Sequence, residues 1–297
     1  MSAILAYVRP DVRRWYERRT SSAADWPTTR SCPASGSCSV SVVLPAHNEA
    51  ATVGAVVTTI LREAGDLLDQ VLVVDSASTD DTAEVAAEAG AEVIGVERPG
   101  KGRALAAGLA ASSGELVVFL DADLRGMHGG FVSGLLGPLL TDPSVHFVKG
   151  TYARTAGRVT ELVARPLVNL HWPRLAGIAQ PLAGEYAGRR ALLETLAFEP
   201  GYGVDLGLLL DAVDAVGLDG LAQVDLGRRV HRHHSDAALG RMAAEVLQAA
   251  LRRLDLPPAA TTLTQFPGGR PVGYDVSVEP LPPLRGATTT GTDRAAS

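Results

Sequence analysis

The chain has 297 residues, of which 46% are hydrophobic, and its formal net charge is −6. This length and apolar content suit one large α/β domain or two smaller ones, each with a buried core. The acidic balance and the lack of a dominant basic stripe argue against a nucleic-acid partner. No apolar run approaches the roughly 20 residues of a membrane span, so we expect no membrane partner and a cytoplasmic location.

Residues 1–38 are predicted to form an N-terminal helix and linker outside the main fold. The helix would cover residues 11–19, and the Ser, Thr, Ala and Pro content of residues 20–39 is typical of a linker. Two cysteines, Cys32 and Cys38, lie in this stretch. They are too few for a disulfide framework or a zinc site, and we interpret them as simple loop thiols.

From residue 39 onwards, short apolar runs alternate with helical stretches. The predicted strands are residues 39–45, 70–74, 91–96 and 115–120, and the predicted helices are residues 50–64, 80–89 and 101–112. This alternation indicates βαβ units, and therefore a mostly parallel sheet with helices on both faces. Ligands of such sheets bind beyond the carboxyl ends of the strands. We therefore expect residues 39–150 to form a ligand-binding half with its site at the carboxyl ends of these strands.

The second half, residues 151–282, has a less regular pattern, and we expect it to form a smaller region of its own. Helical spacing covers residues 158–170, 205–216 and 237–254, and strand-like runs cover residues 184–189 and 221–226. The remaining residues, 283–297, are predicted to form a disordered tail.

The motif Asp121-Ala122-Asp123 follows the apolar residues 116–120. Two carboxylates at this spacing can share a hard cation such as Mg²⁺ or Mn²⁺, which keeps coordination positions open for phosphate oxygens. Such a metal would neutralise a diphosphate leaving group. Asp-x-Asp alone is a weak motif, and a solvated turn or a helix cap is the alternative. Its place at the end of a strand, beside three other polar strand ends, favours the metal site.

Two other strand ends carry candidate ligand contacts. Asp75 and Ser76 end the second predicted strand, where they can hydrogen-bond a nucleobase edge, although the residues after them would also suit a helix N-cap. Lys101 stands between two glycines, so a loop could approach a ligand closely and the ammonium could meet phosphate. The spacing is not that of a P-loop, and a solvated loop lysine is the alternative.

The second half adds two further candidate sites. His231, His233 and His234 invite a zinc interpretation, but no partner pattern supports it. One histidine could instead complete the coordination of the metal at Asp123, with surface histidines as the alternative. Arg158 opens a helix after Gly157, which is a place for a phosphorylated or carboxylated acceptor, unless it is an ordinary cap with a solvated arginine.

These motifs resemble those of the glucosyl-3-phosphoglycerate synthases of actinobacteria, which are retaining glycosyltransferases of the GT-A fold. Segments 43–49, 75–82 and 99–102 occur across GT-A enzymes, whereas segments 157–167, 180–187, 201–205 and 263–266 are specific to this family. The resemblance implies a metal-dependent transfer of glucose from UDP-glucose to the 2-hydroxyl of 3-phosphoglycerate, by a homodimer. It runs from about residue 39 to about residue 282, and it implies that residues 39–150 are the nucleotide-sugar-binding half and residues 151–282 the acceptor-binding half.

The site residues expected from the strand ends and the resemblance fall into four groups. Those expected to bind the donor are Pro45, Ala46, His47, Glu49, Asp75, Ser76, Lys101, Asp121, Ala122 and Asp123. Those expected to bind the acceptor and the sugar are Gly157, Arg158, Val159, Thr160, Tyr202, Asp205 and His233. The expected metal ligands are Asp123 and His231, and the expected catalytic residues are Asp123, Lys101, Asp205 and Leu182.

Three residues depart from the family pattern. His47 replaces a common Leu, Asp205 a Glu, and His233 an Asn, and the segment before Gly157 is short. Asn at the position of His233 helps hold the acceptor phosphate, so the acceptor identity is the least determined inference. The alternatives are a GT-A transferase using GDP-mannose or another small acid acceptor, and a non-catalytic sugar-nucleotide-binding protein. A sugar nucleotidyltransferase would carry a Gly-rich loop where residues 46–49 stand.

No carboxylate in the sequence is recognisable as a covalent nucleophile. We therefore expect same-face attack on the sugar, in which the departing diphosphate takes the proton of the acceptor. The metal and Lys101 would stabilise the leaving charge. Asp121 is expected to face the nucleotide or the sugar, leaving the metal to Asp123.

Overall fold

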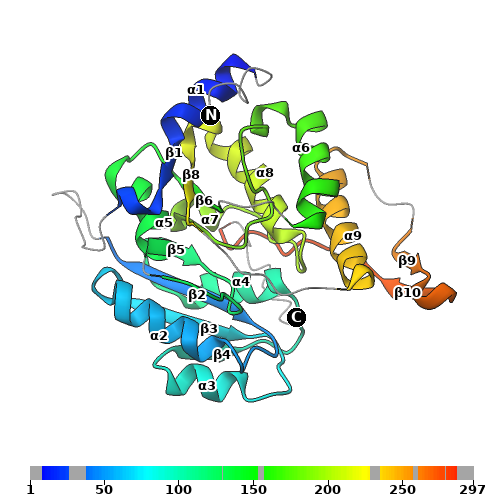
Figure 1. Cartoon of the computed structure of the whole chain (residues 1–297), viewed down its shortest axis with the longest axis horizontal. Helices are drawn as coiled ribbons and strands as arrows, with labels where there is room; N and C mark the ends of the chain where they lie inside the picture. Colours follow the sequence, from blue (N-terminus) through cyan, green and yellow to red (C-terminus); the bar gives the residue numbers. More distant parts are fainter. Residues whose placement is uncertain are drawn as a thin grey trace, which may run out of the picture.

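The computed structural model describes residues 9–26, 38–128, 130–152, 157–227, 235–256, 260–277 and 279–285. Its centre is one eight-stranded sheet with helices on both faces (Figure 1). In spatial order, the strands are β1 (Thr20–Ser22), β8 (Leu221–Asp225), β6 (Phe147–Thr151), β7 (Tyr186–Arg189), β5 (Leu116–Phe119), β2 (Val40–Ala46), β3 (Gln70–Asp75) and β4 (Glu92–Gly95).

Neighbouring strands run parallel except at β7, which is antiparallel to both β5 and β6. The predicted α/β class with a mostly parallel sheet is therefore confirmed. Strands β6, β7 and β8 come from the second half of the chain and join the same sheet as β2 to β5. One sheet thus crosses position 150, where the sequence suggested a division.

The helices surround this sheet and include every helix that the sequence predicted. In chain order they are α1 (Pro10–Arg19), α2 (Val53–Ala64), α3 (Thr82–Glu88), α4 (Lys101–Ala111), α5 (Gly130–Thr141), the π-helix η4 (Thr160–Ala164), α6 (Arg165–His171), α7 (Arg190–Leu193), α8 (Val204–Val216) and α9 (Asp236–Arg252). Shorter 3₁₀ turns are η2 (Ala23–Asp25), η3 (Gly65–Leu67), η5 (Pro173–Leu175), η6 (Leu218–Gly220) and η7 (Pro267–Gly269).

Apart from the short 3₁₀ turns, the elements not predicted from the sequence are β1, α5, β6, α7 and a small hairpin. The hairpin consists of β9 (Thr262–Gln265) and β10 (Val272–Asp275) and lies beside α9, outside the main sheet (Figure 1). Helix α5 contains four glycine and proline residues, a composition that disfavours helix. Its burial against the sheet outweighs that local preference.

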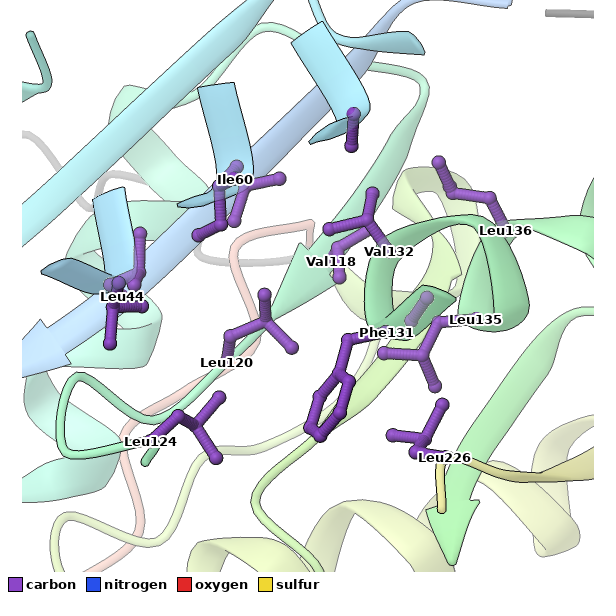
Figure 2. Packing of buried hydrophobic residues seen from close by; sticks show 14 of the residues in the cluster. Leu44, Ile60, Val118, Leu120, Leu124, Phe131, Val132, Leu135, Leu136 and Leu226 are labelled. Atoms are coloured by element: carbon purple, nitrogen blue, oxygen red, sulfur yellow. The ribbon is translucent and has the colours of Figure 1, made fainter. Parts of the chain in front are cut away.

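Each face of the sheet carries its own apolar core, because side chains of a strand alternate between faces. On one face, Leu44 of β2 and Val118 of β5 pack with Ile60 of α2 and Phe131 of α5 (Figure 2). On the other, Val43 belongs to a cluster formed with helices α4, α6, α8 and α9. The sheet is therefore covered on both sides, and ligands have access at its edges and strand ends.

Two successive arginines at the end of β7 tie helices to opposite faces of the sheet. Arg189 donates to the carbonyl oxygens of Val145 (2.9 Å) and Leu139 (2.8 Å) near the end of α5. Arg190 donates to those of Leu109 (2.8 Å) and Gly114 (2.6 Å) near the end of α4. These guanidinium groups satisfy carbonyls that helix ends leave unpaired, which fixes α4 and α5 against β7.

The N-terminal segment belongs to the fold. Helix α1 confirms the predicted helix. Strand β1 pairs with β8 as the edge strand of the sheet, so the prediction of a linker is wrong for residues 20–22. The turn that follows β1 packs against glycines of α5. A Cβ at Gly137 would lie 2.1 Å from the Trp26 ring, so only glycine leaves room there. The indole of Trp15 is buried and donates to the carbonyl of Leu221 at 2.9 Å.

Cys38 is disulfide-bonded, so our interpretation of simple loop thiols is wrong for this residue. The chain's other cysteine, Cys32, lies outside the described residues, as do residues 286–297 of the predicted disordered tail. Spacing and composition do not encode whether two nearby thiols pair. Within the described part of the chain, no helix is long and apolar enough to cross a membrane.

Candidate active site

The carboxyl ends of β2 and β3 lie side by side, as the parallel register requires. Ala46 is opposite Asp75 in the ladder, and the amide of Ser76 donates to the carbonyl of Ala46 at 2.7 Å. The ring of His47 continues this contact through a 2.7 Å hydrogen bond between its Nδ1 and the carbonyl of Ser76. His47 therefore braces the two strand ends against each other.

Asn48 locks the loop after β2 onto the loop after β3. Its backbone is left-handed (φ 55°), and its Oδ1 accepts a 2.8 Å hydrogen bond from the amide of Thr79. The amide of Glu49 donates to Thr82 Oγ1 at 2.8 Å, at the start of α3. Asparagine adopts this conformation more readily than most residues, and its short amide can bond locally. The two loops thus form one rigid rim.

Asp75 presents an acceptor at this rim. Its Oδ2 accepts a 3.3 Å hydrogen bond from the amide of Ser78, whereas its Oδ1 is buried and has no hydrogen-bond partner among the described residues. A buried acceptor without a donor is costly, and a ligand N–H would satisfy it. The Oγ of the neighbouring Ser76 already accepts a hydrogen bond from the amide of Gly100 at 3.0 Å.

Lys101 is the first residue of α4 and lies between two carboxylates. Its Nζ is 2.9 Å from Asp121 Oδ1 and 3.0 Å from Asp205 Oδ2. Only 13% of its side chain is exposed, which excludes the alternative of a solvated loop lysine. Burial on its own lowers the pKa of Lys101, but Asp121 and Asp205 outweigh it and hold the pKa well above its usual value.

The glycines around Lys101 serve packing as well as any ligand approach. A Cβ at Gly102 would lie 1.7 Å from the carbonyl oxygen of Glu199, and one at Gly100 would lie 2.5 Å from that of Pro200. Gly100 also has a φ of 154°, which favours glycine. These close contacts bring the start of α4 against the chain that leads into α8. Lys101 reaches Asp205 for this reason.

The two aspartates of the Asp-x-Asp motif have different surroundings. Asp121 is paired with Lys101, whereas Asp123 lines a cavity of about 150 Å³ together with Glu49 and Arg125. The intervening Ala122 is buried in the apolar core, so it holds the motif in place. The expected roles, a metal ligand for Asp123 and a nucleotide or sugar contact for Asp121, stay predictions.

The donor set near Asp123 fits a divalent cation that is shared with phosphate. A carboxylate at an open cavity supplies the hard oxygen that Mg²⁺ and Mn²⁺ prefer, and such ions keep positions for phosphate oxygens. No group of three or more His, Cys, Asp or Glu residues that could hold a metal occurs within the described ranges. The expected second ligand, His231, lies outside those ranges, as does His233.

The residues expected to bind the acceptor open the helical segment that continues into α6. Val159 and Thr160 are buried, while the Arg158 side chain is 65% exposed and forms an ion pair with Asp236 at the start of α9. An ion pair this exposed is weak, so the guanidinium can exchange Asp236 for another anion. Gly157 has open space around it.

Tyr202, Leu182 and Asp205 lie on the α8 side of the sheet. The amide of Tyr202 donates to Glu245 Oε2 of α9 at 2.6 Å, and its ring is half-exposed. Leu182 packs against the apolar cluster that contains Val204. Asp205 is 5% exposed; burial raises its pKa, which the two lysines oppose, and its Oδ1 has no hydrogen-bond partner among the described residues.

The sequence analysis missed the buried residues behind this cluster. Lys149 of β6 and Tyr186 of β7 face Asp205, Glu185 lies near both of them, and Gly184 lets Asp121 approach Lys101. Single polar residues within apolar strands carry no motif. The one sequence feature that could have indicated Lys149 is that the chain has lysine at only two positions.

Comparisons with known proteins agree with this geometry. Residues 41–190 match the model of glycosyl transferase family 2. Glucosyl-3-phosphoglycerate synthase of Mycolicibacterium paratuberculosis is 43% identical over 300 residues, covering 91% of each chain. The enzyme of that name from Petrotoga mobilis is 40% identical over 239 residues, covering 73% of each.

A solved structure of the Mycobacterium tuberculosis glucosyl-3-phosphoglycerate synthase, in complex with Mn²⁺, UDP-glucose and phosphoglyceric acid, superposes with a TM-score of 0.80. It is 43% identical in sequence and covers 87% of this chain and 98% of its own. A second structure of that enzyme holds Mn²⁺, UDP and glucosyl-3-phosphoglycerate, with the same TM-score.

Proposed function

Because this chain belongs to glycosyl transferase family 2 and to the glucosyl-3-phosphoglycerate synthases within it, we propose that it transfers glucose from UDP-glucose to the 2-hydroxyl of 3-phosphoglycerate. The observation that carries the proposal is the cluster of Lys101, Asp121 and Asp205 at the strand ends, next to Asp123 at an open cavity. Within this cluster, Lys101 and Asp121 are expected to contact the donor at its diphosphate, and Asp205 is expected to contact the sugar.

The rim formed by β2 and β3 is proposed to hold the nucleoside. Asp75 Oδ1 is a buried acceptor that no described residue satisfies, which suits the N–H of a uracil ring. Pro45, Ala46, His47, Glu49 and Ser76 would complete the contacts, and His47 would act by bracing the rim. Asp121 and Ala122 would place the donor against Lys101.

Asp123 would hold the divalent metal together with His231, with diphosphate oxygens as the remaining ligands. A bound Mg²⁺ or Mn²⁺ supplies charge neutralisation for the diphosphate. The Mn²⁺ of the related Mycobacterium tuberculosis enzyme supports this assignment. The ammonium of Lys101 provides a second, fixed positive charge at the same place.

Transfer by same-face attack needs few groups from the protein. The bond from the anomeric carbon to the diphosphate oxygen breaks, the acceptor 2-oxygen bonds to that carbon, and the acceptor proton passes to the departing oxygen. Lys101 would stabilise the charge on that oxygen as it develops. Asp205 Oδ1 is buried and has no partner in the described part of the chain. It would accept a hydrogen bond from a sugar hydroxyl and orient the ring, near the backbone of Leu182.

The acceptor is proposed to bind at the start of the segment that leads into α6. Arg158 offers a guanidinium held by an exposed ion pair, beside Gly157, Val159 and Thr160. Tyr202 and His233 would complete the pocket. In this arrangement residues 39–150 bind the donor and residues 151–282 the acceptor. A homodimer and a cytoplasmic location are part of the same proposal.

An assay of UDP release tests the proposal. Purified enzyme with UDP-glucose and Mn²⁺ is expected to release UDP with 3-phosphoglycerate, and to do so far more slowly with other phosphorylated hydroxy acids or with GDP-mannose. Asp123→Asn should lose at least a hundredfold in rate, whereas Asp214→Asn, in an exposed ion pair with Arg174, should retain wild-type activity. Full activity of Asp123→Asn would disprove the metal role, and transfer to a different acid would reassign the acceptor.

A further inference from the structure

The chain uses lysine at only two positions. It has 27 Lys and Arg residues, and Lys101 and Lys149 are the only lysines among them. Both lie within hydrogen-bonding distance of one residue, Asp205. A chain that uses arginine everywhere else has therefore kept the smaller ammonium at the two places that touch this aspartate.

Lys149 is in the middle of β6, and its side chain is fully buried. Its Nζ donates a 3.1 Å hydrogen bond to the backbone carbonyl of Asp205 and lies 4.5 Å from the centre of the Tyr186 ring. Burying an ammonium is costly unless it is paired, so an apolar side chain would serve the core better. A role beyond packing is needed to explain it.

The position of Lys149 also explains why arginine is absent there. The surrounding strands are close, since a Cβ at the next residue, Gly150, would lie 2.8 Å from the carbonyl of Glu185. A guanidinium is planar and larger than an ammonium, and it needs several acceptors in its plane. The compact ammonium fits between β6 and the first turn of α8.

Carboxylates outnumber ammonium groups around Lys149. Asp205, Asp121 and Glu185 act on it as negative charges, and Lys101 is the positive charge that acts on it among the described residues. Burial and Lys101 lower the pKa of Lys149 to about 8, against the three carboxylates, which raise it. If Lys101 turns toward a bound diphosphate, Lys149 is the cation that stays with Asp205.

We propose that Lys149 is a positioning residue for Asp205. It holds the backbone of the first turn of α8 and remains as the counter-charge of Asp205 when Lys101 engages the donor's diphosphate. The inference rests on the proposed function, in which Asp205 orients the sugar. Lys149 itself does not contact substrate, and it acts through the carboxylate that does.

The coupling between the two residues can be measured without activity. Because the chain has two lysines, ¹³C-lysine labelling of untagged protein gives two side-chain NMR signals, and Lys101→Met or Lys149→Met assigns them. The Lys149 signal is expected to titrate near pH 8, and Asp205→Asn should lower that midpoint because it removes a negative charge. A midpoint that Asp205→Asn leaves unchanged would overturn the proposal.

The role in transfer follows from a double-mutant cycle in the UDP-release assay. Lys149→Met should lower kcat at least tenfold in the wild-type background and less than twofold in the Asp205→Asn background, with KM for 3-phosphoglycerate changed less than twofold. Arg189→Met is the matched control, because it removes a partly buried cation that donates to carbonyls away from Asp205. Any loss of kcat caused by Arg189→Met should be equal in the wild-type and the Asp205→Asn backgrounds.

The outcomes separate this inference from the proposed function. Equal losses for Lys149→Met in both backgrounds, or wild-type activity of Lys149→Met, would refute the positioning role while leaving the function intact. If wild-type enzyme released no UDP with any acceptor, the proposed function would fail, and the NMR titration would still decide the coupling. If Lys149→Met did not fold, Lys101→Met and Asp205→Asn would suffice for the titration.

Discussion

Gly184 is the residue whose replacement tests the cluster most directly. It precedes β7, and its backbone passes against the ion pair of Asp121 and Lys101. A Cβ built at Gly184 would lie 2.5 Å from both carboxylate oxygens of Asp121 and 2.6 Å from Lys101 Nζ. Gly184→Ala therefore places a methyl group where the two charged groups now meet.

The size of the effect follows from these distances. Ordinary contact begins near 3.4 Å, so the carboxylate and the ammonium must each retreat by about 1 Å. A displacement of about 1 Å in a catalytic group costs on the order of a hundredfold in rate, or about 3 kcal/mol of transition-state stabilisation. We expect Gly184→Ala to lower kcat/KM for UDP-glucose by about that factor.

The assay is UDP release at saturating 3-phosphoglycerate, with thermal unfolding to verify the fold. Gly65→Ala is the matched control, because no atom lies within 4 Å of a Cβ at Gly65 and its backbone is helical. That variant should be fully active and no less stable. If Gly184→Ala retained more than a third of wild-type kcat/KM, the inference that activity depends on the close contact between Asp121 and Lys101 would be wrong.

Three further predictions address other parts of the molecule. Asp75→Ala should weaken UDP binding about tenfold or more in calorimetry, because it removes a buried acceptor. Arg190→Met should lower the free energy of unfolding by about 2–3 kcal/mol, measured in urea, as carbonyls near the end of α4 lose their donor. Hydrogen bonds from Ser144 and Arg19 lower the pKa of Asp142 to about 2. Their contribution to the free energy of unfolding is therefore present above pH 4 and lost as pH falls through 2. Asp142→Asn should therefore cost about 1 kcal/mol or less at pH 7, since the side chain is partly exposed, and nothing below pH 2.

The strands and helices of the donor half were predictable because their apolar residues repeat with a clear period. Strand β2 and helix α4 lie close to the predicted bounds, and buried parallel strands produce continuous apolar runs. Helix α5 was not predictable, because its Gly and Pro content disfavours helix and only burial against the sheet and Trp26 stabilises it. Strand β1 is short and polar, and it becomes a strand only by pairing with β8.

The sequence by itself determined the class of fold and the family, and it predicted the edge of the sheet where chemistry occurs. These depend on local periodicity and on motifs whose residues are neighbours in the chain. Only the tertiary structure decided how those motifs combine. Lys101 meets Asp205 across 104 residues of sequence, through glycines that pack the start of α4 against residues 199–200. Long-range contacts of this kind leave no local pattern, which is why Lys149 and Gly184 emerged only from the folded chain.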